Sequence, residues 1–266
     1  MEIDKISQAI KNVAEQEILP RFRNLKEHEV ILKAPGDFVT EADLAAEKLL
    51  IEKLSELYPT SIISGEEQLV GSPEKLDELV TAPLGFLIDP IDGTNNFIKG
   101  DERFAVMVVA LQNGIAVASW IYIPFINKMA VAQKGSGAYL NGQKITLHSL
   151  PEKLDQIVGA AHINRMQDDL RAKVRVNLKT FIENIPAFCA GFDYVSLAQS
   201  KKHFSAYNRT LLWDHLPGTL LYEEAGGYVR GLDGKKYTSK NDGNGLLCAP
   251  NEDLWHKIKE AMFIGT

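Results

Sequence analysis

The segment FLIDPIDGTNNFIKG, residues 86–100, most constrains how this chain can fold. Its apolar start, FLI, predicts a strand in the core, and Pro90 is expected to end that strand because proline has no N–H to donate to a neighbour. Asp89 and Asp92 follow within the next four residues. We expect a tight turn to bring both carboxylates to one face, so a buried strand would deliver two acids to one place.

The residues around these two aspartates indicate what the acids could bind. The Ile91 carbonyl lies between the carboxylates in sequence, and such an all-oxygen set suits Mg²⁺ better than Zn²⁺. The six histidines do not cluster along the chain, so we do not expect a zinc site. Gly93 allows a close backbone approach, and Thr94 can begin a helix whose free N–H groups point at an anion. The alternative at this point is a pair of turn-capping aspartates.

Three further segments place acids or hydroxyls where predicted elements begin or end: DFVTEAD at 37–43, SGEEQ at 64–68 and LWDHLPG at 212–218. Thr40 with Asp43 three residues later is typical of a helix cap; for Asp43 the alternative is a plain N-terminal charge. Asp214 is expected to begin a helix, with Pro217 in its first turn and capping as its alternative. Four acidic segments together favour a metal site.

Apolar periodicity predicts helices and then a mainly antiparallel sheet in the first 150 residues. The expected helices cover 3–13, limited by Pro20, and the stretch after Thr40 up to Pro59. Strands are expected at 61–64, 84–88, AVMVVAL, IAVASWIYIP and 128–133, with Asn-Gly turns at 113–114 and 141–142.

A linker-like break near Leu150-Pro151 precedes a second half in which predicted strands and helices alternate. The strands are expected at 157–161, 186–190, 227–230 and 245–249, and the helices at 167–181, 191–200 and 214–224. Such alternation predicts an α/β subdomain. We therefore divide the chain into an N-terminal α+β subdomain, 1–150, that carries the metal-binding motifs, and a C-terminal α/β subdomain, 151–266, that completes the active site and the substrate pocket.

Composition narrows the partners. The net charge is −6 and no run of Lys and Arg occurs, so no nucleic-acid partner is expected. No apolar stretch is long enough to predict a membrane span, and the opening MEIDKISQAI does not read as a signal peptide. Cys189 and Cys248 are the only cysteines; we interpret them as buried thiols in a reducing cytoplasm.

The joint pattern of DPIDGTNNF, GEE upstream, and WD followed by EAGG downstream resembles the inositol monophosphatase family of Mg²⁺-dependent, lithium-sensitive phosphatases. The resemblance extends from about Lys33 to Val229. It implies an α/β (α+β-like) fold, a five-layer αβαβα sandwich of the sugar-phosphatase type, related to fructose-1,6-bisphosphatase and often a homodimer.

Carried over residue by residue, the resemblance implies five metal ligands: the side chains of Glu66, Asp89, Asp92 and Asp214, and the Ile91 carbonyl. Catalytic roles are implied for Glu66 and for Asp43 and Thr94, the pair that orients and deprotonates the attacking water. The Gly93 and Thr94 N–H groups match the phosphate cradle. Substrate contacts are expected from Asp92, Gly93, Thr94, Asn208, Arg209 and Asp214.

The chain departs from the family pattern where the substrate alcohol would bind. Relatives commonly have alanines after WD, whereas this chain has His215, which we interpret as an exposed or packed residue. Relatives often place a glutamate some residues before WD, whereas AYNRTLLWD has Asn208 and Arg209 and no acid. An arginine there favours a second anionic group on the substrate. Lys33 lies near a loop lysine of relatives, one residue out of step with Asp37.

These residues predict Mg²⁺-dependent hydrolysis of a small phosphate monoester by in-line attack of a metal-activated water, with inositol monophosphate as the default substrate. One alternative is a fructose-1,6-bisphosphatase or a nucleotide 3′-phosphate phosphatase on the same fold. The other is a regulatory binding protein that keeps the fold without turnover.

Overall fold

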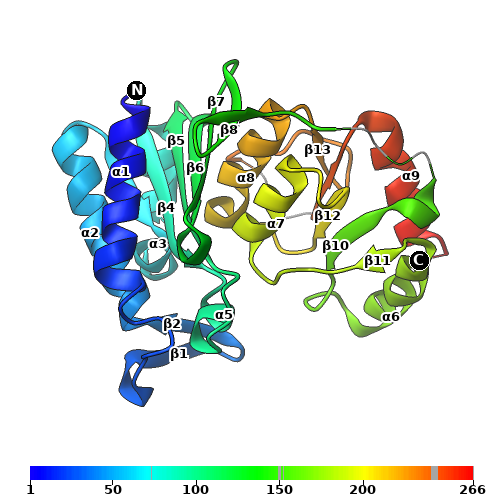
Figure 1. Ribbon diagram of the computed structural model, residues 1–266, viewed down its shortest axis with the longest axis horizontal. Coiled ribbons are helices and arrows are strands. Elements are labelled where there is room, and N and C mark those ends of the chain that lie inside the picture. The colour runs from blue at the N-terminus through cyan, green and yellow to red at the C-terminus, as the bar shows by residue number, and fades with distance from the viewer. Residues whose placement is uncertain (73, 149–150, 152, 241–244, 266) are drawn as a thin grey trace.

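A computed structural model describes residues 1–72, 74–148, 151, 153–240 and 245–265 of the chain. These residues form five layers that alternate between helices and sheets (Figure 1). The helices are α1 Ile3–Val13, α2 Glu41–Leu57, α3 Glu66–Gly71, α4 Glu74–Thr81, α5 Thr94–Ile98, α6 Asp168–Asn177, α7 Ala190–Ala198, α8 Leu212–Glu224 and α9 Glu252–Phe263.

The strands belong to a hairpin and two larger sheets. They are β1 Val30–Ala34, β2 Asp37–Thr40, β3 Ile62–Gly65, β4 Gly85–Asp92, β5 Ala105–Gln112, β6 Ile115–Ile123, β7 Lys128–Gln133, β8 Gly137–Leu140, β9 Gln143–Ile145, β10 Val158–His162, β11 Glu183–Asn184, β12 Phe204–Tyr207, β13 Tyr228–Gly231 and β14 Leu246–Ala249. The seven-stranded sheet has the order β3-β4-β5-β6-β7-β8-β9 and is antiparallel except for its β3–β4 pair.

The five-stranded sheet has the order β11-β10-β12-β14-β13 and is mixed. Its β10 strand runs parallel to both β11 and β12, whereas β14 is antiparallel to β12 and β13. The carboxyl ends of β10 and β12 therefore meet at one edge, where loops that carry functional side chains commonly lie.

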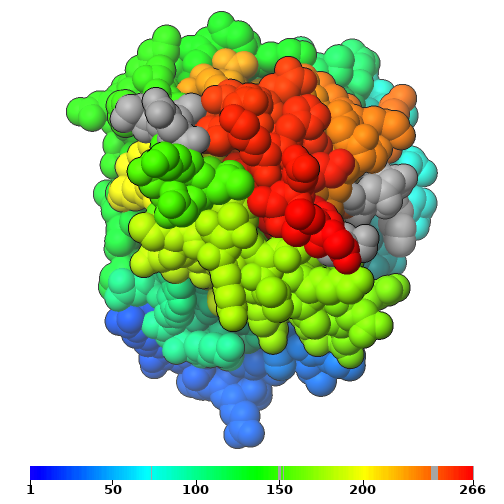
Figure 2. Space-filling model, turned by 90° about the vertical axis from the view of Figure 1, so that its right-hand side faces the viewer, coloured from blue at the N-terminus to red at the C-terminus, as the bar shows by residue number. Residues whose placement is uncertain are grey.

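Three apolar clusters hold the layers together. One joins α1 and α2 to one face of the first sheet, and a second places α7 and α8 between the two sheets. The third packs α6 and α9 on the outer face of the second sheet; Figure 2 views the molecule from that end, with α9 in red. The predicted αβαβα sandwich is thereby confirmed, and its middle helical layer comes from the second half of the chain.

Most predicted elements of the first half are present. Both Asn-Gly turns form, with Asn113 and Asn141 in the left-handed region (φ 49° and 48°), which suits tight hairpin turns. Thr40 caps α2: its hydroxyl accepts from the Ala42 and Asp43 N–H groups, and the Asp43 carboxylate accepts from the Thr40 N–H.

The predicted break near Leu150-Pro151 falls partly outside the described residues, and the division of the chain into two subdomains there stays a prediction.

One predicted strand in the second half, at 186–190, is wrong. Residues 186–189 form no strand; the short β11 lies earlier, and Phe188 turns the chain with φ +57°. Strand β12 and helix α9 were not predicted. None of the helices in the described part of the chain has the length and apolar character that crossing a bilayer requires. Both cysteines are free and buried, as predicted.

Candidate metal centre and substrate pocket

Strand β4 carries the two aspartates further than predicted. Pro90 does not end the strand, because β4 continues to Asp92 with an irregularity between Asp89 and Asp92. Asp89 lies opposite Met107 and Asp92 opposite Ala105, so three steps on β4 match two on β5, as in a bulge. Residues two apart on a strand share a face. The extra residue therefore turns both aspartates to the side of the sheet that α7 and α8 cover.

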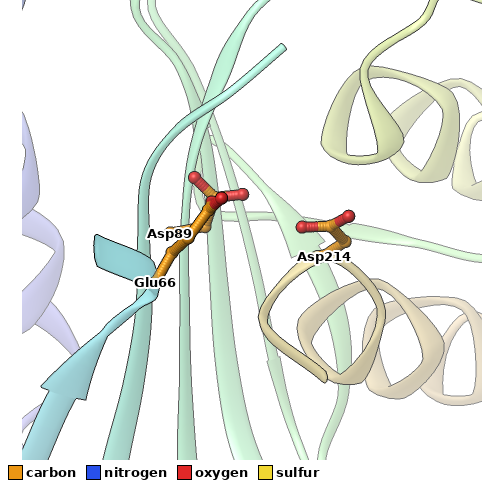
Figure 3. Close-up of side chains that lie close together, drawn as sticks. All are labelled: Glu66, Asp89 and Asp214. Carbon is orange, nitrogen blue, oxygen red and sulfur yellow. The ribbon is translucent and has the colours of Figure 1, made fainter. Parts of the chain in front are cut away.

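Three of the predicted ligands meet there. Glu66, Asp89 and Asp214 each offer a carboxylate oxygen, and these oxygens lie within 4.8 Å of one another (Figure 3). Glu66 is the first residue of α3, directly after β3, and Asp89 lies on the adjacent parallel strand. Asp214 enters from α8 on the opposite side. Three segments distant in sequence thus converge on one point.

Asp214 does not cap its helix. Helix α8 begins at Leu212, its N-cap residue is Leu211, and Pro217 lies inside the helix rather than in its first turn. The carboxylate of Asp214 is turned toward Glu66 and Asp89 instead of toward the backbone N–H groups of its own helix. Trp213 is buried in the core between the sheets.

The electrostatics of Glu66, Asp89 and Asp214, which we call the carboxylate triad, favour a bound cation. Burial raises the pKa of Glu66 to about 7, and burial together with the neighbouring acids raises the pKa of Asp89 and Asp214 well above the usual range. Carboxylates brought this close repel when ionised, and a bound cation relieves that repulsion. The donor set consists only of oxygens, which fits a hard divalent cation.

Lys33 supplies a positive charge at one side of the triad. Its Nζ lies 3.2 Å from Glu66 Oε1 and 2.8 Å from Glu67 Oε1, and 4.0 Å from Asp37 Oδ1. Burial lowers the pKa of Lys33, but Glu66 and Glu67 outweigh it and raise the pKa above its usual value. The β1–β2 hairpin, which carries Lys33, therefore contacts the metal centre through this side chain.

The Asp92 carboxylate accepts hydrogen bonds from residues at the start of α7. Its Oδ2 accepts from the Gly191 N–H at 2.6 Å and from the Cys189 thiol at 3.0 Å. Burial raises the pKa of Asp92, and these hydrogen bonds oppose that effect. The carboxylate lines the same cavity as the triad; its role as a metal ligand stays a prediction.

The turn after β4 brings Gly93 and Thr94 to the start of α5; their role in binding phosphate stays a prediction. Gly93 has φ +86°, and a Cβ there would lie 3.0 Å from the Cβ of Cys189, so only glycine fits. Thr94 begins α5, and N–H groups in a first helical turn have no acceptor within the helix. Thr94 Oγ1 lies 3.3 Å from Asp43 Oδ1 and 3.0 Å from the Ile91 carbonyl oxygen.

Asp43 is a buried carboxylate in a position to accept a proton. Only 1% of the residue is exposed. Burial raises its pKa to about 7, although hydrogen bonds from Thr40 oppose the shift. A carboxylate with a pKa near neutrality suits a general base.

Two cavities that share lining residues are found at the candidate site. The smaller one, of about 160 Å³, is lined by Glu66, Asp89, Ile91, Gly93 and Thr94. The larger, of about 370 Å³, is lined by His162, Tyr207, Asn208 and His215. Asp92, Asp214, Arg165 and Arg209 line both cavities, which therefore adjoin each other.

A family model described as the inositol monophosphatase family matches residues 1–263. The chain belongs to this family.

Individual relatives agree with that assignment. An inositol-1-monophosphatase of Mesorhizobium japonicum is 28% identical over 91% of this chain and 88% of its own. A fructose-1,6-bisphosphatase/inositol-1-monophosphatase of Thermotoga maritima is 30% identical over 79% of each chain. The solved structure of the extragenic suppressor protein suhB from Bartonella henselae superposes with a TM-score of 0.85 at 25% identity, over 99% of each chain.

His215 is where this member of the inositol monophosphatase family departs from the expected alanine. It is a packed residue, 2% exposed. Its Nε2 lies 3.1 Å from the Arg209 carbonyl oxygen, which can only accept, so Nε2 carries the proton and donates. Nδ1 is then the acceptor of a hydrogen bond from the Tyr194 hydroxyl at 3.1 Å. Burial lowers the pKa of His215 to about 3, so the ring is neutral.

A buried charge network behind the larger cavity was missed from the sequence. Asp193, fully buried on α7, pairs with Lys202 and lies 2.7 Å from Nε2 of His162. Its only sequence signal was an acid in the apolar stretch CAGFDYVSLA, and such a charge is stable in the core only when paired.

Glu47 is a second residue that sequence reasoning did not assign to the site. Its carboxylate accepts from the N–H groups of Glu67 (2.8 Å) and Gln68 (3.1 Å) and thereby holds the start of α3. Any Cβ at Gly65 would collide with that carboxylate. The available signal was an acid inside the apolar face of α2, where burial raises its pKa to about 7.

Proposed function

We propose that this chain hydrolyses a small phosphate monoester with Mg²⁺ as its cofactor. The observation that carries the proposal is the convergence of Glu66, Asp89 and Asp214 within 4.8 Å, beside the Asp43–Thr94 contact. Hydrolysis of a phosphate monoester is extremely slow without a catalyst, so charge neutralisation and positioning must supply most of the acceleration. The site contains residues for both tasks.

Each residue has a role in this proposal. Glu66, Asp89, Asp214, Asp92 and the Ile91 carbonyl would hold Mg²⁺, which when bound neutralises charge on the phosphate and on the leaving oxygen. The Gly93 and Thr94 N–H groups bind phosphate oxygens. Thr94 and Asp43 orient the attacking water, and Asp43 accepts its proton.

Inositol monophosphate is the substrate we propose first, because the relatives at 27–28% identity include proteins with that activity in their names. A fructose-1,6-bisphosphatase is the second candidate, favoured by the combined name of the Thermotoga maritima relative. A nucleotide 3′-phosphate phosphatase is related chemistry on the same fold. Phosphate release from a panel of these three substrate types, with Mg²⁺ present, ranks them.

A regulatory protein without turnover is the remaining alternative. If no member of the panel releases phosphate and Asp89→Asn changes no measured property, this alternative replaces the enzyme. The retained acids argue against it, because a buried carboxylate cluster without a cation carries an electrostatic cost.

Inhibition by lithium is a further part of the proposal. Li⁺ at millimolar order should compete for one cation position and lower the rate of phosphate release. A rate that stays constant across a lithium titration, with K⁺ as the matched control salt, would contradict it.

We also propose that the protein is a homodimer and that it is located in the cytoplasm. Light scattering tests the homodimer, and cell fractionation tests the location.

A further inference from the structure

Two arginines stand at the junction of the two cavities. Strand β10 ends at His162 and strand β12 at Tyr207, and these two residues are register partners in a parallel pair. Arg165 and Arg209 follow within three residues of these strand ends. Parallel strands place the loops at their carboxyl ends side by side. Both arginines consequently line the smaller cavity and the larger one.

The backbone at each arginine is held by a side chain of the pocket. The Asn208 amide Nδ2 donates to the Arg165 carbonyl at 3.1 Å, which ties the two loops together. His215 donates to the Arg209 carbonyl and is itself held by the Tyr194 hydroxyl. Asn208 and His215 are two of the positions at which the chain departs from its family. They act here as positioning residues for the arginines.

The charge of the larger cavity is set by these arginines. Within the described ranges, neither Arg165 nor Arg209 forms an ion pair, and the only acids that line this cavity are Asp92 and Asp214. Both acids also line the metal cavity, where a cation would take up their charge. The remaining polar lining consists of amide, imidazole, phenol and thiol groups.

We propose that Arg165 and Arg209 form a subsite for a second anionic group, a phosphate or a carboxylate, on the alcohol part of the substrate. The guanidinium group binds such oxyanions through paired hydrogen bonds. A volume of about 370 Å³ lies in the range of small-molecule sites. This inference rests on the proposed phosphatase function. Of the substrates proposed for that function, it favours the second candidate, a sugar bisphosphate, over inositol monophosphate, whose alcohol part is uncharged.

Matched substrate pairs test the subsite. Fructose 1,6-bisphosphate is compared with fructose 1-phosphate, which lacks the second phosphate, and 3-phosphoglycerate with glycerol 1-phosphate, which lacks the carboxylate. The expected kcat/KM is about tenfold or more higher for the anionic member of at least one pair, since hydrogen bonds to charged groups have that effect. The pair that shows the difference identifies the group.

Variants assign the effect to the arginines. Arg165→Gln and Arg209→Gln should each lower the ratio of kcat/KM within the discriminating pair by about fivefold or more. Arg175→Gln is the matched control, because it removes an exposed charge of the same sign on α6, outside both cavities; it should leave the ratio unchanged.

A binding measurement separates failure of the subsite from failure of the proposed function. In Mg²⁺-free buffer, fructose 6-phosphate should bind to the wild type in calorimetry more tightly than fructose, and Arg209→Gln should weaken it. Ratios near one in both pairs, with phosphate released from the monophosphates, overturn the subsite and leave the phosphatase. If no substrate is hydrolysed, the proposed function fails, and equal binding of fructose 6-phosphate and fructose then overturns the subsite as well.

Discussion

Thr94 Oγ1 lies 3.3 Å from Asp43 Oδ1, although 51 positions separate the two residues in sequence. The contact joins the first turn of α2 to the first residue of α5. The hydroxyl has one proton and two acceptors within reach, Asp43 and the Ile91 carbonyl. A water beside this pair would therefore meet both a hydroxyl that can reorient and a carboxylate that can accept a proton.

Asp43→Asn tests this pair. The amide keeps the shape of the side chain, and its oxygen can still accept from Thr40, but it cannot accept a proton. We expect kcat to fall by about 10² to 10⁴, the usual contribution of a general base, with the fold retained in circular dichroism. Glu41→Gln is the control, since Glu41 is an exposed acid in the same helical turn. If the kcat of Asp43→Asn is within a factor of two of the wild-type value, Asp43 is not the general base.

The metal-free protein should lose stability as pH rises from about 5 to 7. Burial raises the pKa of Asp43, Glu47 and Glu66 to about 7 from their ordinary values of 3.8, 4.5 and 4.5. Between these limits the folded state binds more protons than the unfolded chain, so the free energy of unfolding decreases with pH. Below pH 6.5, the usual pKa of histidine, the lowered pKa of His215 makes the free energy of unfolding increase with pH. This is the contribution of one group, and several carboxylates contribute in the opposite direction.

Urea unfolding in EDTA at pH 5 and pH 7 measures this change, which we expect to be on the order of 1 to 3 kcal/mol. Saturating Mg²⁺ should abolish it, because metal binding favours the deprotonated carboxylates. A metal-free protein that is more stable at pH 7 than at pH 5 would contradict the assigned pKa shifts.

Mg²⁺ should stabilise the wild type against unfolding and should fail to stabilise Asp89→Asn. Binding to the folded state alone adds about 2.7 kcal/mol at a concentration one hundred times Kd. Without metal, the variant should be at least as stable as the wild type, because it removes a buried acid whose ionisation Glu66 and Asp214 oppose. Asp155→Asn, at an exposed acid far along the chain, should respond to Mg²⁺ as the wild type does. Equal responses in Asp89→Asn would argue that the cation binds elsewhere.

Lys33→Met should have two opposite effects. Loss of the contacts to Glu66 and Glu67 should lower the metal-free stability by about 1 to 3 kcal/mol, between the values for exposed and buried pairs. The affinity for Mg²⁺ should rise, because the ammonium no longer competes for Glu66. Calorimetric titration with Mg²⁺ measures the affinity, with the exposed Lys134→Met as control. A weaker affinity in Lys33→Met would show that Lys33 supports the cation rather than competing with it.

The sequence indicated where the acids of the candidate site lie because each is beside a strong local pattern. Asp89 follows the apolar run that begins β4, Asp43 follows a helix cap, and Glu66 follows the strand that ends at Gly65. What it did not predict is the bulge that carries β4 through Pro90, because a register shift is decided by the partner strand.

The substrate side was harder to predict because tertiary contacts determine it. Nothing local to Asp193 indicates Lys202 as its partner, and nothing local to His215 indicates that it holds the Arg209 carbonyl. The residues near 186–190 are apolar enough to suggest a strand, yet they form the turn that delivers Cys189 to Asp92. Long-range pairing overrides local propensity at such places.

Phosphate release by the purified protein, measured with Mg²⁺, with EDTA and in Asp89→Asn, tests the proposed metal centre most directly. We expect release from at least one small phosphate monoester, loss of that release in EDTA, its return when Mg²⁺ is added back, and little or none in Asp89→Asn. Release that is equal with Mg²⁺ and with EDTA, or that is unchanged in Asp89→Asn, would contradict the proposed metal centre.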